Sequence, residues 1–124
     1  MSDRFEKLPV WQTSHELTLL IMREVAPQLP GGEASDLAGE IMRASMTVGA
    51  TLAGASGHFY TKERVRRCYE ARGLLYETLN YVLLIDDVHY LPDALQQRTR
   101  RLTEEALVLL NDFIASLRKK GSTD

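Results

Sequence analysis

Apolar residues recur along four stretches of the chain at intervals of three and four, the spacing that gathers side chains on one side of an α-helix. We expect helices over about 10–26, 33–56, 61–88 and 92–120. The second stretch carries the clearest series of apolar and small residues: Leu37, Ile41, Ala44, Val48, Leu52 and Ala55. Sustained alternation of apolar and polar residues, the signature of a strand, is missing. The pattern therefore predicts an all-α fold.

Turn-forming residues separate the four stretches, at 27–32, 57–60 and 89–92. Thr61 is expected to cap the start of the third helix, and Pro92 to occupy the first turn of the fourth. Short connections between long helices join neighbours that run in opposite directions. We therefore expect an antiparallel up-and-down four-helix bundle that uses all 124 residues as one domain.

Two glycines inside the second predicted helix call for an explanation. Gly49 and Gly54 each cost about 1 kcal/mol relative to alanine at such positions. A helix tolerates this cost where a neighbour needs the space, so we expect another backbone to come close at both glycines.

Apolar residues also occur beside the predicted core stripes, and a monomer would leave some of them in water. They are Leu19, Met46, Leu74, Tyr81, Ile85, Val108, Leu110 and Ile114. A second buried surface would accommodate them, which favours self-association. The alternative is that they only widen the core.

The net charge of −2, from 15 basic and 17 acidic residues, gives no overall attraction for nucleic acid. The basic residues cluster locally, however, at 62–72, 98–101 and 118–120. The candidate nucleic-acid-binding residues are Lys62, Arg64, Arg66, Arg67, Arg98, Arg100 and Arg101. Tyr60 and Tyr69 would add rings on which bases could stack. The alternative is a solvated helix face with internal ion pairs, such as Glu63 with Arg67.

The cysteine content and hydropathy pattern indicate the compartment. Cys68 is the single cysteine, which excludes an internal disulfide and suits a reducing compartment. No apolar run approaches the roughly 20 residues of a membrane span, and Met1–Lys7 is polar, unlike a signal peptide. We expect a cytoplasmic protein with no membrane partner.

No set of residues with a catalytic or metal-binding spacing emerges. Cys68 falls on a predicted core stripe without a histidine placed as its base. Asp86 lies three residues before His89, but a di-iron bundle needs that spacing on two helices and further glutamates. The acidic residues Glu33, Asp36 and Glu40 fall on one face of the second predicted helix. A magnesium site would also need a second acidic pair on another helix, and the sequence does not offer one. We predict no catalytic residues, no metal, no cofactor and no enzymatic activity.

Two separated segments resemble a known family, the four-helix-bundle proteins named after the intervening sequences of bacterial 23S ribosomal RNA genes. The first is the opening Phe5–Gln12 with His15–Leu17, and the second is Ala71–Glu77. The matching positions to which we assign structural roles are Trp11, His15, Glu16, Arg72, Gly73, Tyr76 and Glu77.

The resemblance implies a homopentameric ring. The accessory variability protein of diversity-generating retroelements is similar, and it partners a reverse transcriptase and binds nucleic acid through a basic surface. This chain departs from the family pattern at Gly49, Thr51 and Ala53–Ala55, where relatives carry a proline, an asparagine and an alanine-glutamate-glycine step. Arg72 and Glu77 are interpreted as a structural ion pair between helices or subunits.

Two functional hypotheses follow. The leading one is a non-catalytic oligomeric bundle that acts as a scaffold or adaptor and has a second copy of itself as its first partner. The alternative is an RNA- or DNA-binding accessory subunit that uses the basic surface of the third helix and works with nucleic acid or a nucleic-acid enzyme.

Overall fold

The computed structural model describes residues 4–31 and 36–121, and the regular structure in these ranges is helical. They contain four α-helices: α1 (Pro9–Leu20), α2 (Leu37–Ala55), α3 (Thr61–Asp87) and α4 (Asp93–Gly121). Shorter helical turns flank α1, at Phe5–Lys7, Ile21–Val25 and Ala26–Gln28. The prediction of an all-α, four-helix fold is therefore confirmed.

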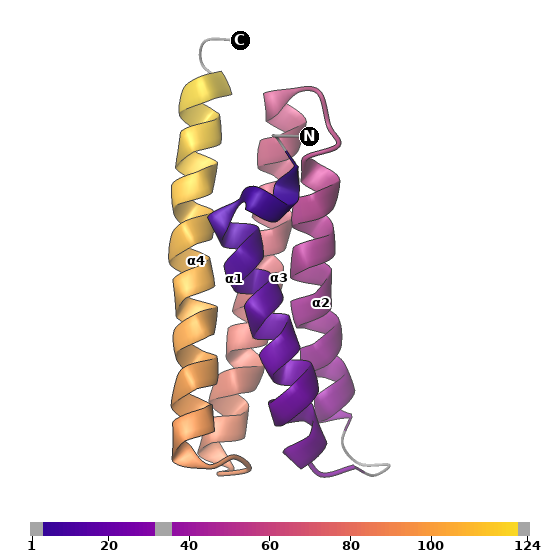
Figure 1. Cartoon of the computed structure of the whole chain (residues 1–124), viewed down its shortest axis with the longest axis vertical. Helices are drawn as coiled ribbons and strands as arrows, with labels where there is room; N and C mark the ends of the chain where they lie inside the picture. Colours follow the sequence, from indigo (N-terminus) through magenta and orange to yellow (C-terminus); the bar gives the residue numbers. More distant parts are fainter. Residues whose placement is uncertain (1–3, 32–35, 122–124) are drawn as a thin grey trace.

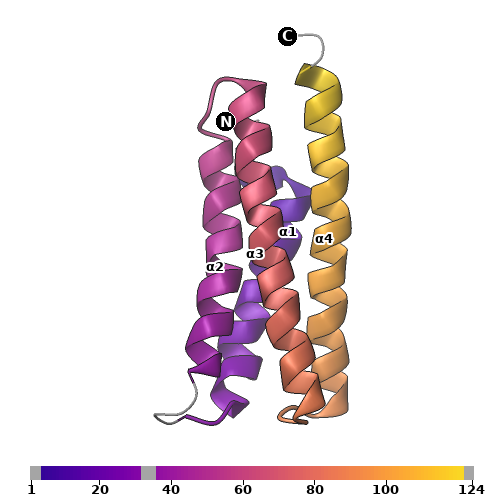
Figure 2. The same ribbon diagram turned by 180° about the vertical axis from the view of Figure 1, so that it is seen from behind.

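The helices lie side by side as the four corners of a bundle (Figure 1). Helix α1 packs against α2 and α4, and α3 packs against the same two helices. Helices α1 and α3 therefore occupy opposite corners, with α1 nearest the viewer in Figure 1 and α3 nearest the viewer in Figure 2. The α1–α2 side and the α3–α4 side consequently lie on opposite faces of the molecule.

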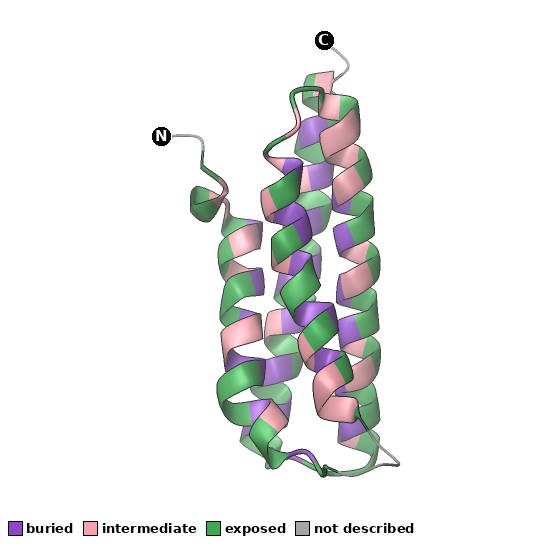
Figure 3. Cartoon of the chain, turned by 90° about the vertical axis from the view of Figure 1, so that its right-hand side faces the viewer, coloured by how far each residue is buried: buried purple, intermediate pink, exposed green. Residues whose placement is uncertain are grey.

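The core lies between all four helices, and buried residues sit on their inward sides (Figure 3). The fully buried large side chains come from every α-helix and include Leu17, Ile41, Leu52, Leu75 and Leu110. Burial of each such side chain contributes about 1.5–3 kcal/mol. This core confirms the prediction that apolar residues spaced three and four apart lie on the buried sides of helices.

The surplus of apolar residues is smaller than predicted. Ile85, Leu110 and Ile114 belong to the core, with exposures of 1%, 0% and 4%. The core-facing stripe of α4 is broader than a simple three-and-four series because α4 packs against both α1 and α3. Met46 and Val108 are exposed, as the sequence suggested.

Several element boundaries differ from expectation. Thr61 is the first residue of α3 rather than its cap, because extended Tyr60 precedes it at the N-cap position. Pro92 lies just outside α4, where its carbonyl oxygen accepts the Gln96 N–H at 3.0 Å. The end of α1 widens into a π-turn at Ile21–Val25, close to Pro27, which has no N–H to continue the helical ladder. Residues 33–35, the expected start of the second helix, lie outside the described residues.

The two α2 glycines face side chains rather than another backbone, which corrects the prediction. A Cβ on Gly49 would lie 3.6 Å from the indole nitrogen of Trp11. A Cβ on Gly54 would lie 2.9 Å from Nη2 of Arg67. The space that glycine leaves on α2 is thus filled by large side chains of α1 and α3.

Within residues 4–31 and 36–121, no helix combines the length and the apolarity needed to cross a bilayer.

Candidate functional site

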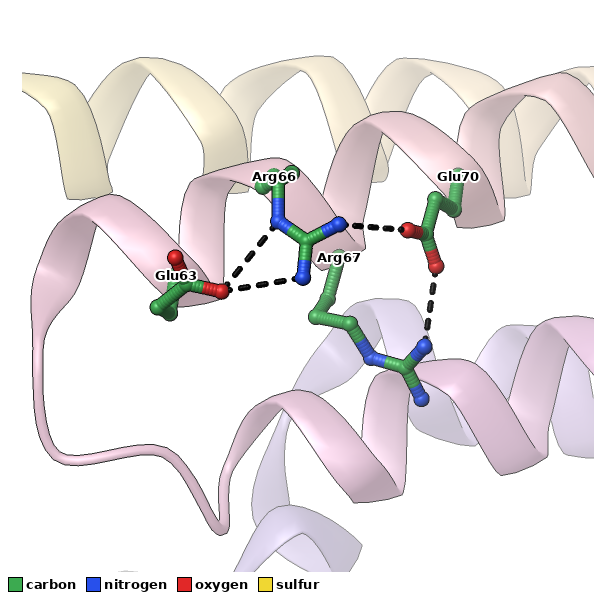
Figure 4. Close-up of polar contacts among 4 residues, drawn as sticks. All are labelled: Glu63, Arg66, Arg67 and Glu70. Atoms are coloured by element: carbon green, nitrogen blue, oxygen red, sulfur yellow. Dashed lines mark hydrogen bonds and ion pairs between the residues drawn. The ribbon is translucent and has the colours of Figure 1, made fainter.

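The first candidate basic group is largely neutralised by glutamates of the same helix (Figure 4). Arg66 contacts Glu63 at 3.0 Å and Glu70 at 3.4 Å, and Arg67 contacts Glu70 at 2.9 Å. The expected pair of Glu63 with Arg67 is not formed, because the Arg67 side chain turns toward α2 and Gly54. Two arginines against two glutamates leave this stretch with little net charge.

Lys62 and Arg64 lie in the turn of α3 before Arg66 and have no carboxylate among the contacts of the described residues. Arg64 donates its Nε–H to the carbonyl oxygen of His58 at 2.6 Å, which ties the α2–α3 loop to the start of α3. Lys62 lines an open cavity of about 380 Å³ between the start of α3 and the end of α4, together with Tyr60 and Arg118. Arg118 donates to the hydroxyl oxygen of Tyr69 at 3.1 Å.

Tertiary packing joins two basic clusters that are far apart in the sequence. The end of α4 adjoins the start of α3, since a Cβ on Gly121 would lie 3.0 Å from the Thr61 methyl group. Arg118 therefore lies beside Lys62, and Lys120 lines a second cavity, of about 230 Å³, with Arg64.

Two largely exposed aromatic rings lie at the same end of the bundle. Phe59 is 86% exposed and Tyr60 is 70% exposed, and their ring centroids lie 5.1 Å apart at an interplanar angle of 90°. We call the set of Phe59, Tyr60, Lys62, Arg64 and Arg118 the basic end. The sequence marks residues 118–120 as basic, and the signal that could have placed them beside the start of α3 is the expected antiparallel arrangement of the third and fourth helices.

The remaining basic candidates lie elsewhere. Arg98 pairs with Glu24 at 3.5 Å, and Arg100 pairs with Glu104 at 3.7 Å. Arg98 and Arg101 share one side of α4, about 60° apart, whereas Arg100 points in another direction, because each residue advances about 100° around a helix. They also lie some twenty residues from the end of α4, a distance of about 30 Å along the helix. The seven predicted residues therefore form no single surface within one chain.

The N-terminal family segment builds a small aromatic stack. The Trp11 ring stacks on His15 with centroids 4.5 Å apart, and Phe5 meets Trp11 edge-on at 5.2 Å. His15 and Glu16 are exposed, and Trp11 is half-buried against Gly49.

The second family segment connects α3 to α4. Arg72 donates to the side-chain oxygen of Asn111 at 3.0 Å, and its guanidinium carbon lies 4.7 Å above the Tyr69 ring. Among the described residues Arg72 has no ion pair with Glu77, so the expected pair is not formed within the chain. Gly73 and Glu77 are exposed, and Tyr76 is 54% exposed.

The acidic residues at the start of α2 are neutralised within the protein. Arg43 contacts Glu40 at 2.9 Å and Asp36 at 3.5 Å, and these contacts raise the pKa of Arg43. The Tyr81 hydroxyl donates to Glu40 at 3.3 Å, and partial desolvation together with the Glu40 charge raises the pKa of Tyr81. Glu33 lies outside the described residues. The described part of the chain holds no cluster of three or more metal-ligating side chains.

Cys68 lies in the core with 0% exposure, as predicted. Desolvation raises the pKa of its thiol to about 11. A buried, protonated thiol is a poor nucleophile, so this residue serves packing.

Two apolar surfaces remain uncovered on opposite faces of the bundle. The first is a groove of about 380 Å³ between α1 and α2, called here the α1–α2 groove. Small residues line part of it (Gly49, Ala50 and Ala53), and larger ones line the rest, among them Phe5, Trp11, Leu19, Met22 and Met46.

The second surface runs along α3 on the side that faces α4. Tyr69, Tyr76 and Leu83 recur every seven residues and are 37%, 54% and 38% exposed. We call these three residues the aromatic edge. Arg72 and Arg118 place it at the α3–α4 side, since each of them links Tyr69 to α4.

The fold and these surfaces define a four-helix-bundle protein that presents a basic end and two apolar faces. The chain belongs to the 23S rRNA-intervening sequence protein family, whose model matches residues 6–112. That description names no reaction, and no curated protein matches the chain.

The fold is similar to a crystal structure of a protein of unknown function from the S23 ribosomal protein family of Bacteroides thetaiotaomicron. The two share 18% identity with a TM-score of 0.76, over 85% of this chain and 97% of the other. At that identity the likeness concerns the fold alone.

Proposed function

We propose that this protein is a non-catalytic, cytoplasmic oligomeric scaffold or adaptor, an antiparallel up-and-down bundle that assembles into a homopentameric ring. The observation that carries the proposal is the pair of uncovered apolar surfaces on opposite faces of one small chain. An apolar face left in water is unfavourable and usually marks an interaction site. The ring size is taken from the family resemblance.

Light scattering after gel filtration at micromolar concentration tests this proposal. A pentamer would have five times the mass of one chain, which is 14.0 kDa. A dimer or tetramer would correct the ring size and keep the self-association. A single species with the mass of one chain across the micromolar range would overturn the proposal.

A second candidate function is that of an RNA- or DNA-binding accessory subunit, and the basic end favours it. Lys62, Arg64 and Arg118 supply positive charge there, and Phe59 and Tyr60 expose ring faces. Single-stranded nucleic acid binds such combinations, because the cations contact phosphates and the rings stack on bases. In an oligomer this end would be repeated once per copy, which would raise the affinity through multivalency.

Fluorescence anisotropy with a labelled single-stranded RNA tests the second candidate. We expect binding that weakens as salt increases, because each contacted phosphate releases counterions. The double variant Lys62→Glu/Arg118→Glu should lose most of the affinity. The matched control is Arg98→Glu/Arg101→Glu, which changes the net charge equally at a distant part of α4 and should retain it. Equal losses in both variants would contradict a specific role for the basic end.

A further inference from the structure

We propose that the aromatic edge of one copy occupies the α1–α2 groove of the next copy, so that the chains associate head to tail. This inference rests on the proposed self-association and names the two surfaces that meet. Neither surface is assigned by the family description, which gives a gene location alone.

The α1–α2 groove suits an apolar occupant. Its lining contains no aspartate, glutamate, lysine or arginine, and its polar side chains are His15 and Thr18, so an inserted ring would strip water from no carboxylate, ammonium or guanidinium group. Ala50 and Ala53 place only methyl groups on the α2 side of the groove, whereas Gly49 is covered by the Trp11 indole, whose nitrogen would lie 3.6 Å from a Cβ there. Large side chains from another helix can therefore approach the α2 backbone closely.

The aromatic edge has the complementary form. Tyr69, Tyr76 and Leu83 stand one above the other along α3, over about 21 Å of helix. Between the two tyrosines lies Gly73, and a Cβ placed there would have no neighbour within 4 Å. Tyr76 and Leu83 project freely, whereas the Tyr69 ring carries the Arg72 guanidinium at 4.7 Å and its hydroxyl oxygen accepts from Arg118. The gap at Gly73 offers space for a side chain from the groove wall.

The two surfaces also match in length. Trp11 and Met22 line the groove eleven residues apart, about 17 Å of helix, and Phe5 extends it further. Each half-exposed tyrosine offers roughly 100 Å² of surface, and flanking residues of both helices would add to the contact. A stable interface needs about 800 Å² per partner, so lengthwise packing of the edge in the groove is required rather than contact at one point.

A second copy of the chain is the occupant because the groove and the edge lie on opposite faces. One chain cannot fold its own edge into its own groove. A two-fold dimer would bring groove against groove or edge against edge, and would leave one surface of each copy uncovered. A head-to-tail contact uses one surface of each kind, and its repetition covers both.

The experiment uses two single variants of the full chain, Ala50→Glu in the groove and Tyr76→Glu on the edge. Both positions are exposed, so a charge there leaves the core intact. Every head-to-tail contact needs one groove and one edge. We therefore expect each variant alone to be a monomer by light scattering. Mixed in equal amounts, they should form a 1:1 dimer with twice the 14.0 kDa mass of one chain.

Matched substitutions away from both surfaces serve as controls. Ala94→Glu introduces the same charge as Ala50→Glu on an exposed turn of α4. Leu84→Glu introduces the same charge as Tyr76→Glu at a 46% exposed apolar position of α3, about 100° around the helix from Leu83. Both controls should assemble like the wild-type chain, and circular dichroism should report the same helix content for all four variants.

The outcomes separate this inference from the proposal on which it rests. A wild-type chain that stays monomeric would overturn self-association itself. A wild-type oligomer that persists in Tyr76→Glu but dissociates in Ala50→Glu would show a groove-to-groove contact and overturn the head-to-tail pairing. Two monomeric variants whose mixture also stays monomeric would overturn it as well.

Discussion

The guanidinium of Arg67 lies over Gly54 of the neighbouring helix, so close that a Cβ on this glycine would lie 2.9 Å from Nη2. The same guanidinium forms an ion pair with the carboxylate of Glu70 at 2.9 Å. Gly73, by contrast, has nothing within 4 Å of a Cβ position and lies in the interior of α3. One glycine therefore makes room for a side chain, and the other serves no packing purpose within the chain.

Gly73→Ala is expected to raise the free energy of unfolding by about 1 kcal/mol, the gain in helix propensity at an unobstructed interior position. Gly54→Ala should gain less or nothing, because Arg67 must shift to admit the methyl group. Urea unfolding at a protein concentration where light scattering finds only the monomer measures both changes without a contribution from assembly. An equal gain in the two variants would show that Arg67 moves without cost.

The end of α3 carries a left-handed residue that is not glycine. His89 has φ of 56°, its N–H donates to Asp86 O at 3.1 Å, and the Tyr90 N–H donates to Ile85 O at 3.3 Å. These two bonds form a Schellman motif, whose left-handed position is usually glycine. His89→Gly is therefore expected to stabilise the protein by about 1 kcal/mol.

His89→Ala is the control for that change, because it removes the imidazole and keeps the Cβ that causes the strain. It should give no gain in the urea midpoint. A gain in stability in both variants would show that the imidazole, rather than the left-handed backbone conformation, destabilises the wild-type protein.

The four helices were predictable from the sequence because burial of one side of a helix imposes a periodic spacing of apolar residues. That spacing can be recognised without knowledge of the tertiary structure. The π-turn at the end of α1 was not predictable, since Pro27 indicates only that the helix must end nearby. The width of the α4 stripe depends on α4 packing against two helices, so the sequence placed Leu110 and Ile114 beside the core stripe and left open whether they widen it. Such differences arise where packing, not propensity, decides.

The candidate site was only partly predictable. Residues 62–67 and 118–120 are more than fifty positions apart, and only the packing of α3 against α4 joins them. The sequence predicted ion pairs within this helix, but not which arginine would pair with Glu63 and which with Glu70. Side-chain rotamers decide which carboxylate each guanidinium reaches. The aromatic edge could not be predicted, since the exposure of Tyr69, Tyr76 and Leu83 depends on how α3 is rotated.

Gln96 is 7% exposed between α3 and α4, and it donates to the carbonyl oxygen of Val82 at 3.0 Å. Its own side-chain oxygen is buried without a partner among the described residues. A buried polar atom without a hydrogen bond costs about 1–3 kcal/mol, more than one neutral hydrogen bond contributes. Gln96→Met keeps the length of the side chain and should raise the free energy of unfolding by about 1 kcal/mol.

Gln97→Met provides the control for this prediction, because Gln97 is exposed on the next position of α4. Its effect on urea unfolding should stay within about 0.5 kcal/mol of wild type. A loss of stability confined to Gln96→Met would show that the amide oxygen is hydrogen-bonded in solution.

Burial of Cys68 makes the stability of the protein depend on alkaline pH, because its thiol has a folded-state pKa of about 11 against an ordinary value of 9.0. Above pH 9.0 the unfolded chain loses this proton while the folded chain keeps it, so the unfolded state binds fewer protons and the free energy of unfolding falls as pH rises. The stabilisation is complete below pH 9.0 and is lost by about pH 11, a change of about 3 kcal/mol. Urea unfolding of wild type and Cys68→Ala under reducing conditions isolates this effect, since all other titrating groups are shared. The advantage of wild type should shrink between pH 9 and 11, and a difference independent of pH would contradict the prediction.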